Sequence, residues 1–207
     1  MKTRCSLFLF LVLLCGTTVR AENIITNGST WKYLIAASEA STPLQAWRGN
    51  TFNDSAFSTG QAPIGDPSTP PDDPNGWEAR IVTTVPQGTT CVFFRKTFLV
   101  ANPALITQLD LSIVIDDGYV AWINGVEVNR FNMAAAPGTD PLFTDLAVVA
   151  GESTFTTLSL TSGLGSLLVP GVNVLAIQAF NANATSSDLV MEATLDTQVD
   201  EDRKSVV

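Results

Sequence analysis

The chain has 207 residues, of which 11 are Lys or Arg, 20 are Asp or Glu and none is His, so its formal net charge is −9. This acidic balance excludes nucleic acid as an expected partner, because phosphate binding needs clustered Lys and Arg. The absence of histidine excludes Ser-His-Asp and Cys-His catalysis and imidazole-based zinc or copper sites, and the length is typical of one all-β domain.

Residues 1–21 are predicted to be a secretory signal peptide. Lys2 and Arg4 precede the apolar run Leu7 to Leu14, and a small-x-small cleavage site ends at Ala21. The apolar run is far shorter than the roughly 20 residues that a membrane span requires, and no later segment supplies one. We therefore expect a secreted, extracellular protein without a transmembrane segment.

Residues 22–196 are expected to form the domain, with its first strand at Thr30 to Ile35. The stretch 61–76 is predicted to be a long irregular loop over one end of the domain, because it is rich in Pro, Gly, Ser and Asp. Loops of this length are usually functional or disordered. Trp47 and Trp77 flank the proline-rich part of the chain, where each either contacts a ligand or pins the loop to the core.

Further strands are expected at 79–85 and 92–100. Cys91 has no intramolecular disulfide partner once the signal peptide is removed, and its apolar surroundings predict a buried small hydrophobe.

Residues 109–131 are predicted to form a three-stranded antiparallel meander. Leu109, Leu111, Ile113 and Ile115 alternate with other residues, which indicates a strand with one apolar face. Tight reversals are expected at Asp117-Gly118 and at Asn124-Gly125, with both glycines at positive φ.

The remaining strands are expected at 155–160, 172–180 and 189–195, followed by a disordered charged tail at 197–207. Many short β segments separated by turn residues, without an amphipathic helix, predict an all-β, antiparallel two-sheet β-sandwich.

Four ordered motifs resemble the galactose-binding-like family, the discoidin and glycosidase sugar-binding type of β-sandwich found in secreted proteins of environmental bacteria. They are FNDSAFSTGQAPIG at 52–65, FFRKTF at 93–98, DDGYVAWINGVEVNRFNM at 116–133 and GVNVLAIQAFNANATSSDLVMEATL at 171–195. The resemblance implies a jelly-roll sandwich. The chain departs from the family pattern at Phe180, where a His is common, and at Asn53, where an Asp is usual.

Calcium is the metal that the sequence favours, since it takes hard oxygen ligands from acidic turns. The candidate ligands are Asp116, Asp117 and Asp188, which lie where the family pattern places acids. The alternative is that these acids cap turns by accepting hydrogen bonds from backbone N–H groups.

The candidate ligand-binding residues are those at the turns and beside the long loop. Arg130 could bind sugar hydroxyls or a uronate carboxylate, or form a structural salt bridge with Glu127. The full set is Trp47, Trp77, Asp117, Asn124, Arg130 and Asn132. Glycosylation sequons begin at Asn27, Asn53 and Asn183, and they matter only in a eukaryote.

Three functions are compatible with these features. The leading hypothesis is a secreted, non-catalytic module that binds carbohydrate or cell-surface glycan, with calcium as a candidate cofactor. The alternative is a structural or adhesive extracellular or surface-layer subunit, which an apolar fraction of 45% supports by indicating possible self-association. The third is a carboxylate-pair glycosidase, which needs two acids flanking the scissile bond.

Overall fold

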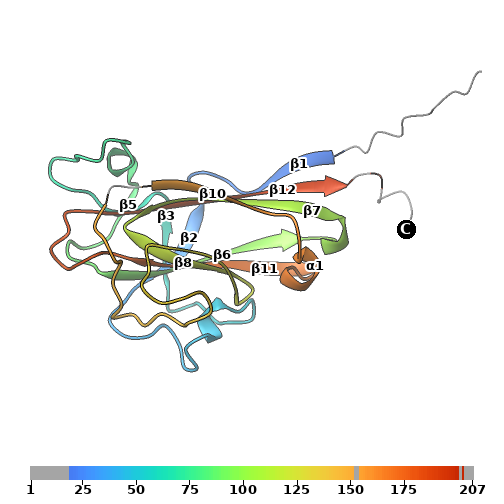
Figure 1. Cartoon of the computed structure of the whole chain (residues 1–207), viewed down its shortest axis with the longest axis horizontal. Helices are drawn as coiled ribbons and strands as arrows, with labels where there is room; N and C mark the ends of the chain where they lie inside the picture. The colour runs from blue at the N-terminus through green and yellow to red at the C-terminus, as the bar shows by residue number, and fades with distance from the viewer. Residues whose placement is uncertain (1–18, 152–153, 201, 203–207) are drawn as a thin grey trace, which may run out of the picture.

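The computed structural model describes residues 19–151, 154–200 and 202, and these residues form two stacked β-sheets (Figure 1). The first sheet has the order β10-β7-β12-β4-β5, with β1 beside β12. Its strands are β1 (Val19–Ile25), β4 (Ile64–Asp66), β5 (Thr83–Thr84), β7 (Ile106–Asp116), β10 (Thr154–Leu160) and β12 (Leu189–Asp200). All pairs in this sheet are antiparallel except β4 with β5.

The second sheet is antiparallel throughout and has the order β3-β2-β6-β11-β8-β9. Its strands are β2 (Thr30–Ile35), β3 (Ser58–Gln61), β6 (Cys91–Val100), β8 (Gly118–Ile123), β9 (Val126–Phe131) and β11 (Gly171–Phe180). The helical elements among the described residues are η1 (Ala46–Arg48), η2 (Glu78–Arg80), η3 (Pro103–Leu105) and the single turn α1 (Leu164–Leu167). The predicted all-β sandwich is therefore confirmed.

The main core lies between the two sheets and follows from the alternation of apolar residues. Leu109, Leu111, Ile113 and Ile115 of β7 all point into it and are at most 1% exposed. Facing residues from β6, β8 and β11 complete the core, which includes Phe94, Tyr119 and Ile177.

The second sheet is buried on both faces along most of β6, β8 and β11. Its outer side chains form a separate apolar cluster around Trp47, Phe93, Trp122 and Phe180. Residues 36–57 and 133–149, which we call the covering layer, supply much of this cluster and run beneath the lower sheet in Figure 1. Strands with two buried faces carry near-continuous apolar runs, as β8 and β11 do.

The predicted meander is only partly correct. β8 and β9 form the expected hairpin, with Asn124 at φ 51° and Gly125 at φ 84°. However, β7 and β8 do not pair, because β7 already has β10 and β12 on its two edges. The chain instead crosses from the first sheet to the second at Asp117, whose N–H donates to the Phe180 carbonyl (3.2 Å).

Gly118 is accordingly not at positive φ, which corrects the expectation for this residue. A Cβ at this position would lie 3.0 Å from the Ala147 Cβ and 3.2 Å from the carbonyl oxygens of Phe131 and Asn132. Glycine is needed here because neighbouring chain segments approach closely.

Three predicted segment boundaries are also corrected. The range 79–85 is not one strand: it begins with the last two residues of η2, and β5 is limited to two residues. By contrast, β4 lies inside the predicted loop 61–76 and pairs with β12. Residues 197–200 continue β12 because β1 pairs with them, so this part of the expected tail is a strand. Val19 to Ala21, assigned to the signal peptide, lie in β1, while residues 1–18, 201 and 203–207 are outside the described residues.

Candidate functional site

Four carboxyl groups meet at one end of the first sheet. Asp116 ends β7, and because Val190 of β12 is its register partner, Asp188 lies at the same end. Segment 67–78, the connection from β4 into η2, brings Asp72 and Glu78 to this position. We call Asp72, Glu78, Asp116 and Asp188 the acidic cluster.

The geometry of the cluster is close. One carboxylate oxygen from each of Asp72, Glu78 and Asp188 lies within 4.8 Å of the others. The Ser68 hydroxyl is 2.6 Å from Glu78 Oε2 and 2.8 Å from Asp72 Oδ1, so it links the two acids of segment 67–78. The Ser68 N–H also donates to Glu78 Oε2 (3.1 Å).

The cluster contains buried oxygens that lack hydrogen-bond partners. Glu78 is 2% exposed and Asp116 is fully buried. Glu78 Oε1 and both carboxylate oxygens of Asp116 have no partner among the described residues. The ion pairs of the described residues involve Glu22, Asp140, Asp54 and Glu127, and none involves an acid of the cluster.

This arrangement raises the proton affinity of the acids. Burial, and then the neighbouring carboxyl groups of Asp117 and Asp188, raise the pKa of Asp116 to about 10. Burial and the neighbouring Glu78 raise the pKa of Asp188 to about 7. Carboxylates this close repel one another unless they are protonated or share a bound cation. A donor set made only of oxygens suits calcium better than a transition metal.

Asp117 does not converge with the other acids in this way. Its Oδ1 accepts the Gly151 N–H (2.7 Å) and its Oδ2 accepts the Ala182 N–H (2.7 Å). Asn132 holds the same crossing, because its Nδ2 donates to the carbonyls of Asp117 (3.2 Å) and Val149 (2.6 Å). Both residues therefore bind backbone groups, and for Asp117 this is the turn-capping alternative.

Asn124 and Arg130 also have structural partners. Asn124 Nδ2 donates to the Leu167 carbonyl (2.9 Å), and its Oδ1 accepts the Val174 N–H (3.0 Å). Arg130 forms a two-pronged ion pair with Glu127, with nitrogen to oxygen distances of 2.9 and 3.0 Å. The structural salt bridge weighed for Arg130 is the arrangement observed.

The two tryptophans differ in exposure. Trp47 is fully buried and makes edge contacts with Phe93 and Trp122, at ring-centre distances of 5.0 and 5.6 Å. It therefore pins the covering layer to the core and corrects the expectation of a ligand-binding residue. Trp77 is half-buried beside Glu78, and the Arg80 guanidinium lies 4.7 Å from its ring centre.

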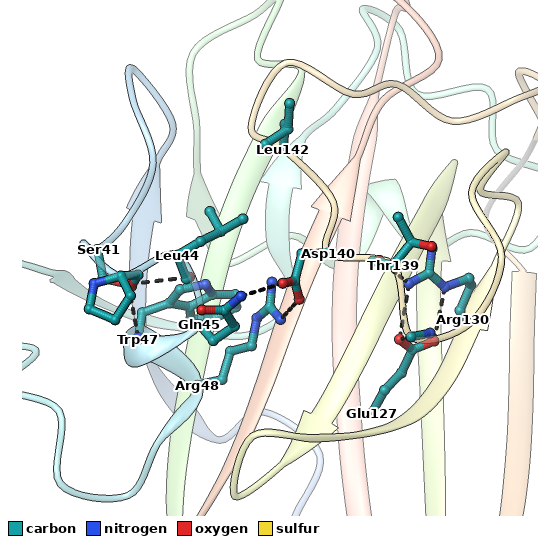
Figure 2. A network of polar contacts seen from close by, with 12 residues as sticks. Ser41, Leu44, Gln45, Trp47, Arg48, Glu127, Arg130, Thr139, Asp140 and Leu142 are labelled. Carbon is teal, nitrogen blue, oxygen red and sulfur yellow. Dashed lines mark hydrogen bonds and ion pairs between the residues drawn. The ribbon is translucent and has the colours of Figure 1, made fainter.

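The covering layer holds a second polar network, shown in Figure 2. Buried Arg48 donates from Nη1 to Asp140 Oδ1 (2.6 Å), and Gln45 also donates to Asp140. The Arg48 guanidinium stacks 3.9 Å from the Trp122 ring centre. Burial lowers the pKa of Arg48. Beside the network lies an open depression lined by Pro43, Gln45, Phe52, Asn53 and Asn124.

The sequon asparagines Asn27, Asn53 and Asn183 are all exposed. Sequence reasoning missed Asp72, Glu78 and Ser68. The signal that could have found them is the concentration of acids between the prolines of a long loop and beside Trp77. Within the described part of the chain, no helix has the length and apolar character needed to cross a bilayer.

No protein-family model matches the chain, and no curated protein matches it. Solved structures do share its fold. A structure of Bacteroides uniformis β-glucuronidase 2, covalently bound to cyclophellitol-6-carboxylate aziridine, aligns with a TM-score of 0.51 and 15% identity over 87% of this chain and 18% of its own. A second structure of Bacteroides uniformis β-glucuronidase also aligns with a TM-score of 0.51 and 15% identity, over 86% of this chain and 18% of its own.

A Ruminococcus gnavus β-glucuronidase in complex with D-glucuronic acid gives a TM-score of 0.49 at 11% identity, over 90% of this chain and 31% of its own. This chain thus spans less than a third of the length of these neighbours. The two Bacteroides uniformis structures define the class of the fold: a two-sheet β-sandwich of a kind that also occurs within glycosidase chains.

Proposed function

We propose that this chain is a secreted, non-catalytic β-sandwich module of the galactose-binding-like type that binds carbohydrate, including cell-surface glycan, with calcium held at the acidic cluster. The observation that carries the proposal is the position of Trp77. This half-buried residue directly precedes Glu78 of the cluster, and its backbone N–H donates to Asp73 Oδ2 (2.7 Å).

Trp77 has the chemistry that a saccharide site needs. Ligand sites combine aromatic surface with a few oriented polar groups. Arg80 is exposed and lies over the indole, where its planar fork of donors suits hydroxyl or carboxylate oxygens. By contrast, the amides of Gln45 and Asn124 in the depression of the covering layer already bond protein groups.

The same geometry supports a non-catalytic role. A glycosidase pair must bracket a sugar, with its two carboxyl groups roughly 5 to 9 Å apart on either side of the scissile bond. Glu78 and Asp116 are buried, so a sugar ring between them would require the site to open. The glucuronidase neighbours share the fold over a fraction of their length, and their activity is not carried over to this chain.

A glycan array and calorimetric titrations of the purified chain, in calcium and in chelator, test the proposal. We expect a saccharide ligand in calcium, and Trp77→Ala should weaken its binding by about tenfold or more, since an aromatic anchor is lost. Val82→Ala is the matched control, because Val82 is an exposed apolar residue (57%) close in sequence. No saccharide ligand in either condition, or hydrolysis of aryl glycosides, would contradict the proposal.

One observation favours the alternative, a structural or adhesive subunit. β10 is an edge strand of the first sheet, has no charged residue, and exposes Phe155 (60%). Uncharged edge strands are templates for pairing with another chain. Light scattering over a wide concentration range tests this alternative: association that Phe155→Lys abolishes would support it, and a monomer throughout would count against it.

A further inference from the structure

Segment 67–78 contributes two of the four acids of the cluster, although it has little regular structure. Asp72 is exposed and lies on the solvent side of the cluster, while Glu78 and Asp188 are buried. Asp116 is the last residue of β7 and Asp188 directly precedes β12, so the cluster joins a loop to the end of the first sheet.

The bonds within the segment orient its acids toward the cluster. Ser68 holds Glu78 Oε2 and Asp72 Oδ1, and the Asp72 N–H donates back to Ser68 Oγ (3.1 Å). Asp73 accepts the N–H groups of Asn75 (2.8 Å) and Trp77 (2.7 Å), which shapes the turn between the two acids. The segment is therefore folded around its own carboxylates.

A buried carboxylate oxygen without a hydrogen-bond partner distinguishes the cluster from acids that only cap turns. Glu78 is 2% exposed and its Oε1 has no partner among the described residues, and the two oxygens of fully buried Asp116 are in the same state. An unpaired buried carboxylate is costly, whereas a divalent cation would satisfy Glu78 Oε1 and reduce the repulsion among the carboxyl groups of the cluster.

We propose that Asp72, Glu78 and Asp188 are the protein ligands of one calcium-class divalent cation, and that this cation fastens segment 67–78 to the end of the sandwich. Asp116 lies beside Asp188 in the buried part of the cluster. Calcium takes six to eight oxygens, so three carboxylates, each able to offer one or two oxygens, and water at the exposed Asp72 side make a suitable set. This inference rests on the calcium element of the proposed function and adds the ligands and the fastened segment.

The fastening has a consequence for Trp77. The indole is one residue from the ligand Glu78, so removal of the cation releases the segment that carries it. Saccharide binding through Trp77 should then depend on calcium, although the cation itself lies in the buried cluster.

Calcium titration of the chelator-treated protein by calorimetry tests the ligand set. We expect one ion per chain, and Asp72→Asn and Glu78→Gln should each weaken binding by about tenfold or more, because the number of charged ligands sets affinity. Asp72 is exposed, so its variant is expected to fold even if Glu78→Gln does not. Asp110→Asn is the control, since Asp110 bonds Gln108 and Ser159 away from the cluster.

The fastening is measured by hydrogen exchange. The amides of segment 67–78 should exchange faster in chelator than in calcium, with little change in β6 and β11. Terbium, which occupies calcium sites, should show luminescence excited through tryptophan, and Trp77→Phe should reduce it without reducing calcium affinity.

The outcomes separate this inference from the proposed function. Calcium binding of unchanged affinity in both Asp72→Asn and Glu78→Gln would overturn the inference and leave a saccharide site standing. Tight calcium binding that needs both acids, together with no saccharide ligand on the array, would overturn carbohydrate binding alone. No calcium binding at all would overturn the inference and the calcium element of the proposed function.

Discussion

Gly118 and Gly125 lie seven residues apart and are needed for different physical reasons. Gly125 has φ 84°, and nothing lies within 4 Å of a Cβ built on it, so its requirement is conformational. Gly118 has ordinary backbone, and its requirement is space beside Ala147. The same substitution at the two sites therefore tests two effects.

Gly125→Ala should lower the free energy of unfolding by about 1 to 2 kcal/mol through left-handed backbone strain, and Gly118→Ala by about 1 to 3 kcal/mol through crowding. Chemical denaturation measures both. In an Ala147→Gly background the cost at Gly118 should shrink, because one crowded contact is gone, while the cost at Gly125 should not change. Equal costs at Gly118 in the two backgrounds would contradict the crowding explanation.

Cys91 is predicted to be inert in the native protein. It is 1% exposed, and burial raises the pKa of its thiol to about 12, so little reactive thiolate forms at neutral pH. Mass spectrometry after iodoacetamide treatment should find the Cys91 peptide unmodified in buffer and modified in denaturant. Rapid native labelling would show that the strand β6 opens locally.

At the scale of elements, the covering layer depends on a few polar contacts. Arg48 is 2% exposed and its charge is paired with Asp140, which is about a third exposed. The neighbouring pair of Glu127 and Arg130 is similar. Burial raises the pKa of Glu127, but hydrogen bonds from Arg130 and from the Gly138 N–H lower this pKa by more, so it lies below its ordinary value. These contacts hold residues 133–149 against the second sheet (Figure 2).

Asp140→Ala should lower the free energy of unfolding by about 2 to 3 kcal/mol, since it leaves a buried guanidinium without its charged partner. Glu22→Ala is the control, because the Arg20–Glu22 pair is exposed and should contribute little. Thermal denaturation compares the two variants with the parent chain. A loss no larger than the control's would show that Arg48 finds another partner or water.

At the scale of the whole molecule, the acidic cluster makes stability depend on pH when no cation is bound. The pKa of Asp116 is raised to about 10 and that of Asp188 to about 7, so between about pH 4 and these values the folded chain holds protons that the unfolded chain releases. Their contribution to stability is therefore greatest at low pH and is lost as the pH rises.

The melting temperature in chelator should accordingly fall between about pH 5 and pH 8, and Asp116→Asn should make that fall smaller. Calcium should flatten the profile, because carboxylates paired with a cation stay ionised in the folded state. Other acids with a raised pKa, including Glu192, change stability in the same direction. The test is therefore the difference in melting temperature between Asp116→Asn and the parent chain at each pH. An identical profile for Asp116→Asn would contradict the assignment.

Sequence alone was sufficient to predict features that depend on neighbouring residues, such as strand positions and tight turns. Alternation of apolar residues predicted β2, β6, β7 and β11 to within a residue or a few, and Asn124-Gly125 predicted its turn because positive φ is a property of those two residues. The two-sheet sandwich follows from the number of such strands and the lack of helices. The acids Asp116 and Asp188 were singled out as oxygen donors in acidic turns.

Tertiary structure alone decided which strands pair and which side chains meet. β7 and β8 are adjacent in sequence but lie in different sheets, because β7 pairs with β10 and β12 on its two edges. Trp47 is buried because the covering layer to which it belongs packs against the second sheet, which no local pattern predicts. Asp72 and Glu78 meet Asp188 from more than a hundred residues away. Periodicity specifies the face of a strand, whereas partners depend on long-range contacts that the whole chain must satisfy together.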